Sequence, residues 1–164
     1  HIAQLDRLAL AALRCSSALD LVSSPQPTMP YTSPSHRISM AWIDCIVKGG
    51  VHCMSLYLRC SEGLSASNQC ILEDANATLL TVVGPWIAAA DWNIRPEVLA
   101  ESAWLRMFGG VIFAIALPTC NDSAYDYFVV HHSIAHAVAG IQRLEDAGCN
   151  PHWPTRLIIR GDAG

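Results

Sequence analysis

Lysine is almost absent from this sequence. Lys48 is the only lysine, arginines carry the remaining positive charge, and the formal net charge at pH 7 is -4. Domains that bind nucleic acids usually present a basic surface to the phosphate backbone. The composition therefore excludes DNA binding that depends on the net charge of the whole chain. A phosphate-cleaving site is still compatible with an acidic chain, because a bound metal ion supplies positive charge locally.

Long apolar runs are also missing. The longest one, residues 111–118, is far shorter than the roughly 20 residues that a helix needs to cross a bilayer. We therefore expect no membrane partner. With 52% hydrophobic and 15% charged residues, the chain is too apolar to stay disordered, and its 164 residues suit one compact domain.

Cysteine spacing typical of metal or redox sites is absent. The sequence has no Cys-x-x-Cys, and its seven cysteines are an odd number, which argues against a complete disulfide framework. Cys149 and His152 form the only close Cys/His pair, and one pair alone is poor support for zinc. We expect buried free thiols and a reducing, intracellular location, nuclear or cytoplasmic.

The first 37 residues differ in composition from the rest. Residues 3–14 have the apolar periodicity of a helix, and the Ser/Pro-rich residues 23–36 predict a linker or irregular loop. Each proline removes a backbone donor, so we expect residues 1–37 to pack poorly. They stay unassigned, and the domain is placed at residues 38–164.

The domain alternates between strand and helix patterns, which favours an α/β sandwich with mixed, largely antiparallel sheets. The predicted elements are a hairpin of residues 38–47 and 51–58 around Gly49-Gly50, a helix over 65–80 that buries Ile71, Leu72, Ala75 and Leu79, a strand over 86–90, a short helix beginning at Pro96, and strands near 111–116, 125–131, 137–144 and 155–160.

Three short polar motifs stand inside or directly after apolar runs. They are Ala90–Asn93, Tyr125–Val130 and Pro151–Pro154. Acids and a histidine at the ends of buried strands are a common construction for phosphoester-cleaving sites, because they lie where the sheet meets solvent. The three motifs in this order favour that chemistry.

In this order the motifs resemble those of the endonuclease/exonuclease/phosphatase superfamily, which includes AP endonucleases, DNase I-like nucleases and endonuclease domains of non-LTR retroelements. Its members carry Gly-Asp-Phe-Asn, then Asp-Tyr before aliphatic residues, then Ser-Asp-His-x-Pro. Residues 57–65 and 84–87 look closest to retroelement-like reading frames of protists. The resemblance covers roughly residues 38–160. It implies part of a four-layer α-β-β-α sandwich in which one sheet is short of strands.

The resemblance implies catalytic roles for four residues. Asp91 would orient or deprotonate the attacking water, and Asn93 would hold the scissile phosphate. Asp126 would accept the ring N–H of His152, and this pair would stabilise charge in the transition state. The alternative is structural: Asp91 and Asn93 favour turns, and the pair could persist in a non-catalytic descendant.

Three aromatic residues are candidates for substrate contact. Tyr57, near the end of residues 51–58, resembles the family's phosphate-contacting tyrosine, although a strand-end tyrosine is often only a rim residue. Trp92 and Trp153 flank the expected site and could stack on a base. The histidines after the Asp126 strand suggest a solvated turn rather than a metal site; they are His131, His132 and His136.

The sequence departs from the family pattern at positions that bear on the metal. Ala90 replaces the glycine of the Gly-Asp-Phe-Asn motif, and Pro151 replaces the metal-binding aspartate of the Ser-Asp-His-x-Pro motif. The family's early asparagine and glutamate have no counterpart. Because Mg²⁺ depends on carboxylate oxygens, we expect weak binding of Mg²⁺, and the metal ligands are left unassigned.

These observations predict a degenerate or truncated Mg²⁺-dependent phosphodiesterase or endonuclease domain of retroelement type that acted ancestrally on DNA. A second hypothesis is a non-catalytic remnant with weak nucleic-acid or protein binding. A third is a small-molecule phosphoesterase, since a fold does not fix its substrate. A dimer partner or the rest of a larger polyprotein is expected to cover the incomplete sheet.

Overall fold

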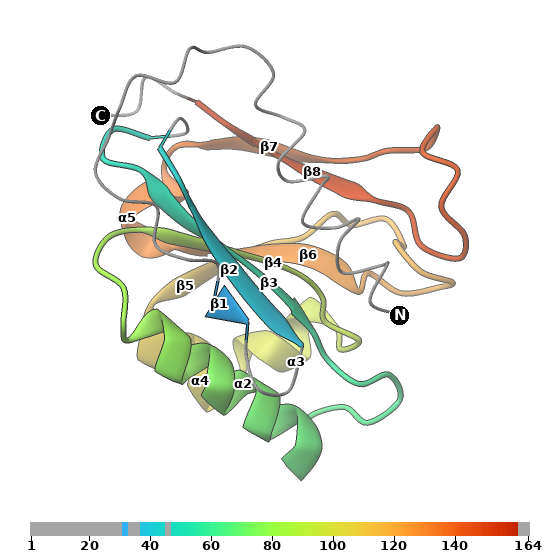
Figure 1. Ribbon diagram of the computed structural model, residues 1–164. Helices are drawn as coiled ribbons and strands as arrows, with labels where there is room; N and C mark the ends of the chain where they lie inside the picture. Colours follow the sequence, from blue (N-terminus) through green and yellow to red (C-terminus); the bar gives the residue numbers. More distant parts are fainter. Residues whose placement is uncertain (1–30, 33–36, 45–46, 161–164) are drawn as a thin grey trace.

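The computed structural model describes residues 31–32, 37–44 and 47–160, which form two sheets and a set of helices (Figure 1). The larger sheet has the strand order β1-β2-β3-β4-β6-β5, and the smaller one pairs β7 with β8. The strands are β1 (Tyr31–Thr32), β2 (Ile38–Ile43), β3 (Val51–Tyr57), β4 (Trp86–Asp91), β5 (Gly110–Phe113), β6 (Asp126–His131), β7 (Val138–Arg143) and β8 (Thr155–Ile159). The helices are α2 (Ala66–Leu79), α3 (Pro96–Ala100), α4 (Ala103–Phe108) and α5 (His132–Ala135).

The larger sheet is buried on both faces. Helices α2, α3 and α4 lie on one face, and the β7–β8 pair lies over the other (Figure 1). Only β3 and β4 pair in parallel, and α2 makes the crossover between them. These layers are part of the α-β-β-α sandwich that the sequence predicts. Within the described residues the second sheet has two strands, in line with the expectation that one sheet is incomplete.

The β2–β3 hairpin forms as predicted around two glycines. Gly49 and Gly50 have φ values of 89° and 78°, in the left-handed region that favours glycine. A Cβ on Gly50 would also lie 2.4 Å from ring atoms of Trp42. The register pairs Ile38 with Leu56, which brings the start of β2 beside the end of β3.

Helix α2 begins at a capped residue and is held to the preceding loop by a buried amide. The Ser65 side chain accepts the Asn68 backbone N–H, and the four apolar residues predicted to face inward are all buried. The Asn68 side chain has 0% exposure and forms hydrogen bonds with the Arg59 N–H (2.7 Å), the Arg59 carbonyl (3.0 Å) and the Gly63 carbonyl (2.7 Å). Asn68 therefore fixes the path of the chain directly after β3.

Three local predictions need correction. Residues 31–32 pair with β2 as strand β1, although residues 23–36 were predicted to be irregular; pairing with an edge strand satisfies their backbone groups. Helix α4 was not predicted: Ser102 caps it and Gly109, at φ 62°, ends it, but its six residues are too few for a clear periodicity. The predicted poor packing of residues 1–37 concerns mainly residues 1–30 and 33–36, which lie outside the described residues. No described helix is long and apolar enough to cross a membrane.

We expect Asn68→Ala to lower the free energy of unfolding by about 2–3 kcal/mol, because it removes a fully buried amide and leaves backbone groups of Arg59 and Gly63 without this partner. Urea unfolding followed by circular dichroism measures this change. Glu73→Ala, an exposed site on the same helix, is the matched control and should change stability by less than about 0.5 kcal/mol. Equal effects of the two variants would contradict this role of Asn68.

Candidate active site

Strand register brings three candidate residues into one row at the edge of the larger sheet. Tyr57 at the end of β3 pairs with Asp91 at the end of β4, and Asp91 pairs with Asp126 at the start of β6. Because β3 and β4 are parallel and β6 is antiparallel to β4, all three positions fall at the same edge. Tyr57 and Asp126 are 69 positions apart in sequence, but only strand β4 lies between them in the sheet.

The connection between β7 and β8 delivers His152 to this edge. His152 forms an isolated β-bridge with Cys120, and the Trp153 N–H donates to the Thr119 carbonyl at 2.6 Å. Thr119 also positions the start of β6, because its buried hydroxyl oxygen accepts the backbone N–H groups of Tyr125 and Asp126, each at 2.9 Å. Thr119 therefore sets the spacing between Asp126 and His152.

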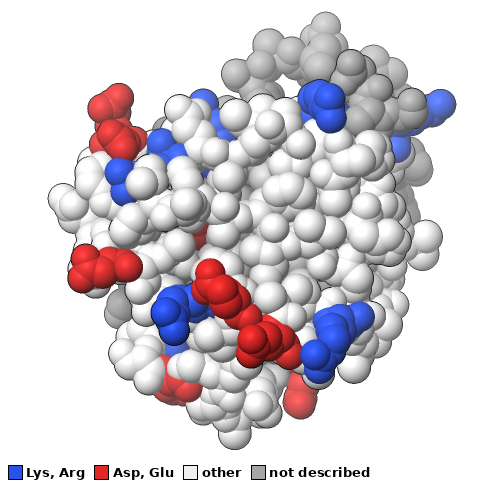
Figure 2. Space-filling model, turned by 180° about the vertical axis from the view of Figure 1, so that it is seen from behind, with Lys and Arg blue, Asp and Glu red and all other residues white. Residues whose placement is uncertain are grey.

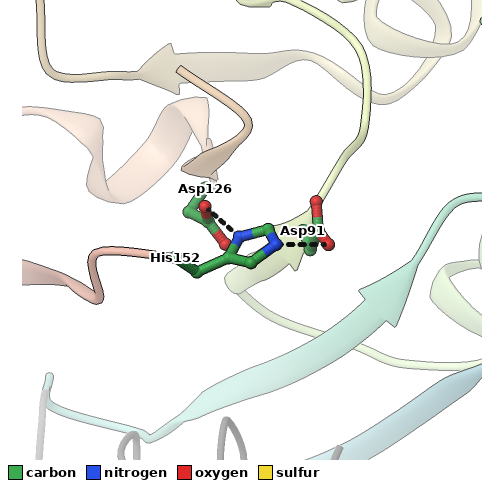
Figure 3. A group of neighbouring side chains, drawn as sticks. All are labelled: Asp91, Asp126 and His152. Atoms are coloured by element: carbon green, nitrogen blue, oxygen red, sulfur yellow. Dashed lines mark hydrogen bonds and ion pairs between the residues drawn. The ribbon is translucent and has the colours of Figure 1, made fainter. Parts of the chain in front are cut away.

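The His152 ring lies between the two carboxylates (Figure 3). Its Nδ1 is 2.9 Å from Oδ2 of Asp126, and its Nε2 is 3.8 Å from Oδ2 of Asp91. The predicted hydrogen bond between Asp126 and His152 is therefore confirmed. The longer distance on the Nε2 side exceeds that of a direct hydrogen bond. Catalytic roles for these residues stay predictions.

Asn93 links the end of β4 to the residue after β3. It adopts φ 51°, a left-handed conformation that asparagine tolerates better than most residues. Its backbone N–H donates to Oδ1 of Asp91 at 3.2 Å, and its side-chain Nδ2 donates to the Leu58 carbonyl at 2.9 Å. Asn93 thus lies beside Asp91, as the motif implies, with its amide partly engaged in holding the two strand ends together.

Burial and the proximity of two acids shift the ionisation of Asp91. Burial raises the pKa of Asp91 to about 6, and the negative charge of Asp126 adds to the rise, whereas His152 and Asn93 oppose it. The pKa of His152 is also raised, chiefly by its hydrogen bond to Asp126, against an opposing effect of burial. A carboxylate whose pKa lies near neutrality suits general base chemistry.

Tyr57 joins the row from the β3 side. Burial raises the pKa of its hydroxyl, and the charge of Asp91 raises that pKa further, while Arg37 and a hydrogen bond with Asn93 lower it. The Arg37 guanidinium lies over the Tyr57 ring at 5.2 Å. The phenol is therefore neutral at physiological pH and can donate a hydrogen bond to a phosphate oxygen.

Of the two tryptophans predicted to stack on a base, Trp92 is excluded. It has 0% exposure, stacks on Tyr127 with ring centroids 5.2 Å apart, and donates its indole N–H to the Tyr127 carbonyl. Its apolar surface is used by the core, so no base can reach it. Trp153 is 37% exposed and carries Arg143 over its ring at 5.1 Å, so it stays a candidate for base stacking.

Two further expectations are corrected. The segment of His131 and His132 is not a solvated turn: His131 ends β6, its side chain accepts the Ser133 N–H, and the short helix α5 buries Ile134. The described cysteines are not generally buried, because three of them are exposed on loops or on α2. The exposed ones are Cys60, Cys70 and Cys149.

Sequence reasoning missed Thr119. The available signal was the turn-forming run Pro118–Asp122 directly before the β6 pattern, which predicts a tight turn beside Asp126. That signal does not reveal that one hydroxyl receives two backbone N–H groups, because this depends on how the turn docks on β6.

The donor set fits a divalent cation with few protein ligands. One ligand atom each from Asp91, Asp126 and His152 lie within 4.8 Å of one another. A cation would offset the repulsion between the two acids, and Mg²⁺ is often held by one or two carboxylates with water and phosphate oxygens completing its shell. Pro151 adds no oxygen ligand from its side chain, so the protein supplies at most two carboxylates here.

Solved structures resemble this chain over most of its length. The endonuclease domain of TRAS1, a telomere-specific non-LTR retrotransposon, has a TM-score of 0.65 and 13% identity, with 96% of this chain and 93% of that chain covered. The 3'-5' exonuclease NExo from Neisseria meningitidis has a TM-score of 0.58 and 14% identity, with 82% and 72% covered. The chain has a DNase I-like fold.

The chain also resembles a toxin with this fold, but the match covers a smaller share of the toxin chain. The Haemophilus ducreyi cytolethal distending toxin has a TM-score of 0.54 and 15% identity, and the match covers 86% of this chain and 60% of that one. NExo has also been solved as a 3' phosphatase with a product DNA hairpin. No family model and no curated protein matches the sequence.

We expect Asp91→Asn to raise the free energy of unfolding at pH 8 in the presence of EDTA. The folded-state pKa of Asp91 is about 6 against an ordinary 3.8, so its ionised form destabilises the fold, and this cost grows as pH rises through 6. Two pKa units correspond to about 3 kcal/mol. The gain should shrink to about 1 kcal/mol near pH 4.5, where the folded protein keeps Asp91 protonated.

Chemical unfolding of both proteins at several pH values measures this difference. Asp122→Asn, an exposed acid in the turn before β6, is the control and should give no such pH dependence. The raised pKa of His152 acts in the same direction, since its stabilisation is lost as pH rises. Asp91→Asn keeps the main cause of that rise, the hydrogen bond to Asp126, and removes only the smaller contribution of the Asp91 charge. A gain that does not vary with pH would contradict the assigned ionisation.

Proposed function

We propose that this chain is a slow, metal-assisted phosphodiester hydrolase that acts on DNA. The observation that carries the proposal is the arrangement of Asp91, Asp126 and His152, in which an imidazole lies between two buried carboxylates at a sheet edge. A purely structural hydrogen bond would need only one of these acids. The second acid, Asp91, adds charge repulsion to the folded protein and has no direct hydrogen bond to the imidazole. This cost favours a functional explanation for its position.

Asp91 is the base of the proposed reaction. Its Oδ2 faces the open side of His152, and its pKa of about 6 leaves it mostly ionised at neutral pH yet basic enough to take a proton. A water beside Asp91 would lose its proton to this carboxylate while its oxygen bonds to phosphorus. The bond from phosphorus to the leaving sugar oxygen breaks, and that oxygen takes a proton from solvent.

The Asp126–His152 pair stabilises the negative charge that develops on the phosphate. Asp126 accepts the Nδ1–H of His152, so the Nε2 side of the ring is directed to the space beside Asp91. The raised pKa of His152 favours the imidazolium, which carries a donor and a positive charge at Nε2. Asn93 and Tyr57 supply neutral donors at the same edge for phosphate oxygens.

A divalent cation, Mg²⁺ in this proposal, would be held by Asp91 and Asp126. When bound, it supplies Lewis-acid stabilisation of a phosphoryl oxygen. Both carboxylates have other tasks: Asp126 is hydrogen-bonded to His152, and Asp91 is the base. Weak binding of the ion and slow turnover follow, because a carboxylate that is coordinated to a cation is a poorer proton acceptor.

Local arginines favour DNA over a small phosphoester. Arg37 lies over Tyr57 on one side of the site. Arg143 lies over Trp153 on the other side and is paired with Glu145 at 2.7 Å. The net positive charge of the rim therefore lies on the Arg37 side, where it can attract an extended polyanion. Elsewhere, on the face opposite to that seen in Figure 1, basic and acidic side chains are interspersed and form no continuous basic area (Figure 2). The likeness to the endonuclease domain of TRAS1 and to NExo, a 3' phosphatase bound to a product DNA hairpin, supports the same substrate.

We expect the purified chain to nick supercoiled DNA slowly in millimolar Mg²⁺ or Mn²⁺, and Asp91→Ala and His152→Ala each to abolish the nicking. Loss of an electrostatic stabiliser typically lowers a rate by about a hundredfold or more, so turnover should lie at least that far below that of the TRAS1 endonuclease domain under the same conditions. Gel electrophoresis of relaxed and supercoiled plasmid measures it, and Asp122→Asn is the matched control.

Two results would count against this expectation in different ways. If wild type and Asp91→Ala are equally inactive with both metals and on abasic-site DNA, the hydrolase proposal fails and the chain is a non-catalytic binding domain. If wild type nicks as fast as the reference domain and Asp91→Ala does not, the function holds but the predicted cost of the missing carboxylate is wrong.

A further inference from the structure

A cavity opens near the same edge of the larger sheet as Asp91. It has a volume of about 290 Å³ and lies between the chain after β3 and the first turns of α2. Two arginines and one acid line the cavity, so the formal charge of the lining is +1. The lining residues are Arg37, Arg59, Ser67, Cys70, Ile71 and Asp74.

The side chain of Arg59 is available for a ligand. Its guanidinium makes no hydrogen bond or ion pair within the part of the chain that the structure describes, whereas its backbone is fixed by Asn68 at both the N–H and the carbonyl. Arg37 is held by its contact with the Tyr57 ring and by a long hydrogen bond to the Tyr57 carbonyl at 3.5 Å. The planar fork of an arginine matches phosphate oxygens, so less side-chain freedom is lost for each hydrogen bond that it forms with an anion.

The start of α2 adds to the positive potential of this cavity. Ser67 lies in the first turn of this 14-residue helix, and that turn contains no acidic residue. A helix N-terminus carries a partial positive charge that favours anions. Asp74, two turns later, is the one opposing charge in the lining.

The cavity lies at a suitable distance from the proposed reaction centre. The Tyr57 N–H donates to the Arg37 carbonyl at 3.0 Å, so Arg37 is one strand spacing from Tyr57 and two from Asp91. Two spacings are roughly 10 Å. This span exceeds the axial rise of one nucleotide, about 3.4 Å, so the cavity can hold a phosphate other than the one that is cleaved.

We propose that the cavity between Arg59 and the start of α2 is a subsite for a backbone phosphate of DNA, separate from the phosphate that is cleaved. Arg59 is its main anion-binding side chain. This inference rests on the proposed function for the identity of the ligand. The subsite holds the strand along the row from Arg37 through Tyr57 to Asp91, and it compensates for the low overall positive charge of the chain.

Fluorescence anisotropy with a labelled DNA duplex in EDTA, from about 20 to 150 mM salt, tests the subsite. Arg59→Gln should weaken binding several-fold at low salt, to a similar extent for unrelated sequences, and reduce the slope of log K against log salt concentration by about 1. Arg59→Lys should keep the slope but recover only part of the affinity.

Arg106→Gln is the matched control. Arg106 lines a separate cavity with Trp86 and His131, which are at the opposite ends of β4 and β6 from Asp91 and Asp126, so its loss should leave the slope unchanged. If Arg59→Gln behaves like Arg106→Gln while wild type still nicks plasmid, the subsite is wrong and the proposed function stands. If wild type does not nick but Arg59→Gln still lowers the salt slope, the subsite stands as a DNA contact and the hydrolase proposal fails.

Discussion

The pairing of β4 with β3 on one side and with β6 on the other fixes everything else at the site. It aligns Tyr57, Asp91 and Asp126 on neighbouring strands. A slip of one residue in either pairing would turn these side chains to the other face and expose the apolar residues that now form two cores, so burial on both faces enforces the register. The same register brings two acids together at the sheet edge, where their mutual repulsion must be compensated.

His152 provides that compensation, and its position depends on a polar turn rather than on the core. Thr119 receives two backbone N–H groups from the start of β6 through its hydroxyl and one from Trp153 through its carbonyl. It therefore couples the strand that carries Asp126 to the loop that carries His152. The imidazole then bonds one acid directly and faces the other across 3.8 Å, a gap in which a water or a phosphate oxygen can interact with both groups.

Much of this arrangement could be predicted from the sequence, because strong local patterns fix it. The inward face of α2, the hairpin at Gly49-Gly50 and the strands that carry the acidic motifs follow from periodicity and turn chemistry. The burial of Trp92 could not be predicted, since a residue next to two polar neighbours can face either side of the strand end. Helix α4 was also out of reach, because its six residues are too few for a clear periodicity. The linking role of Thr119 could not be predicted either, because it depends on a contact with Trp153, which is distant in sequence.

The ionisation of Asp91 bears on whether the cluster is a relic. Its raised pKa means that the folded protein carries a buried charge at neutral pH that an amide of the same shape would not carry. Natural proteins commonly keep such destabilising groups where activity requires them. A cation or an imidazolium beside Asp91 lowers the electrostatic cost of this buried charge. A phosphate whose oxygens approach Nε2 of His152 would in turn stabilise the positive charge of the imidazolium. The acids and the imidazole therefore form one charge pattern, which the proposed metal ion and phosphate would complete.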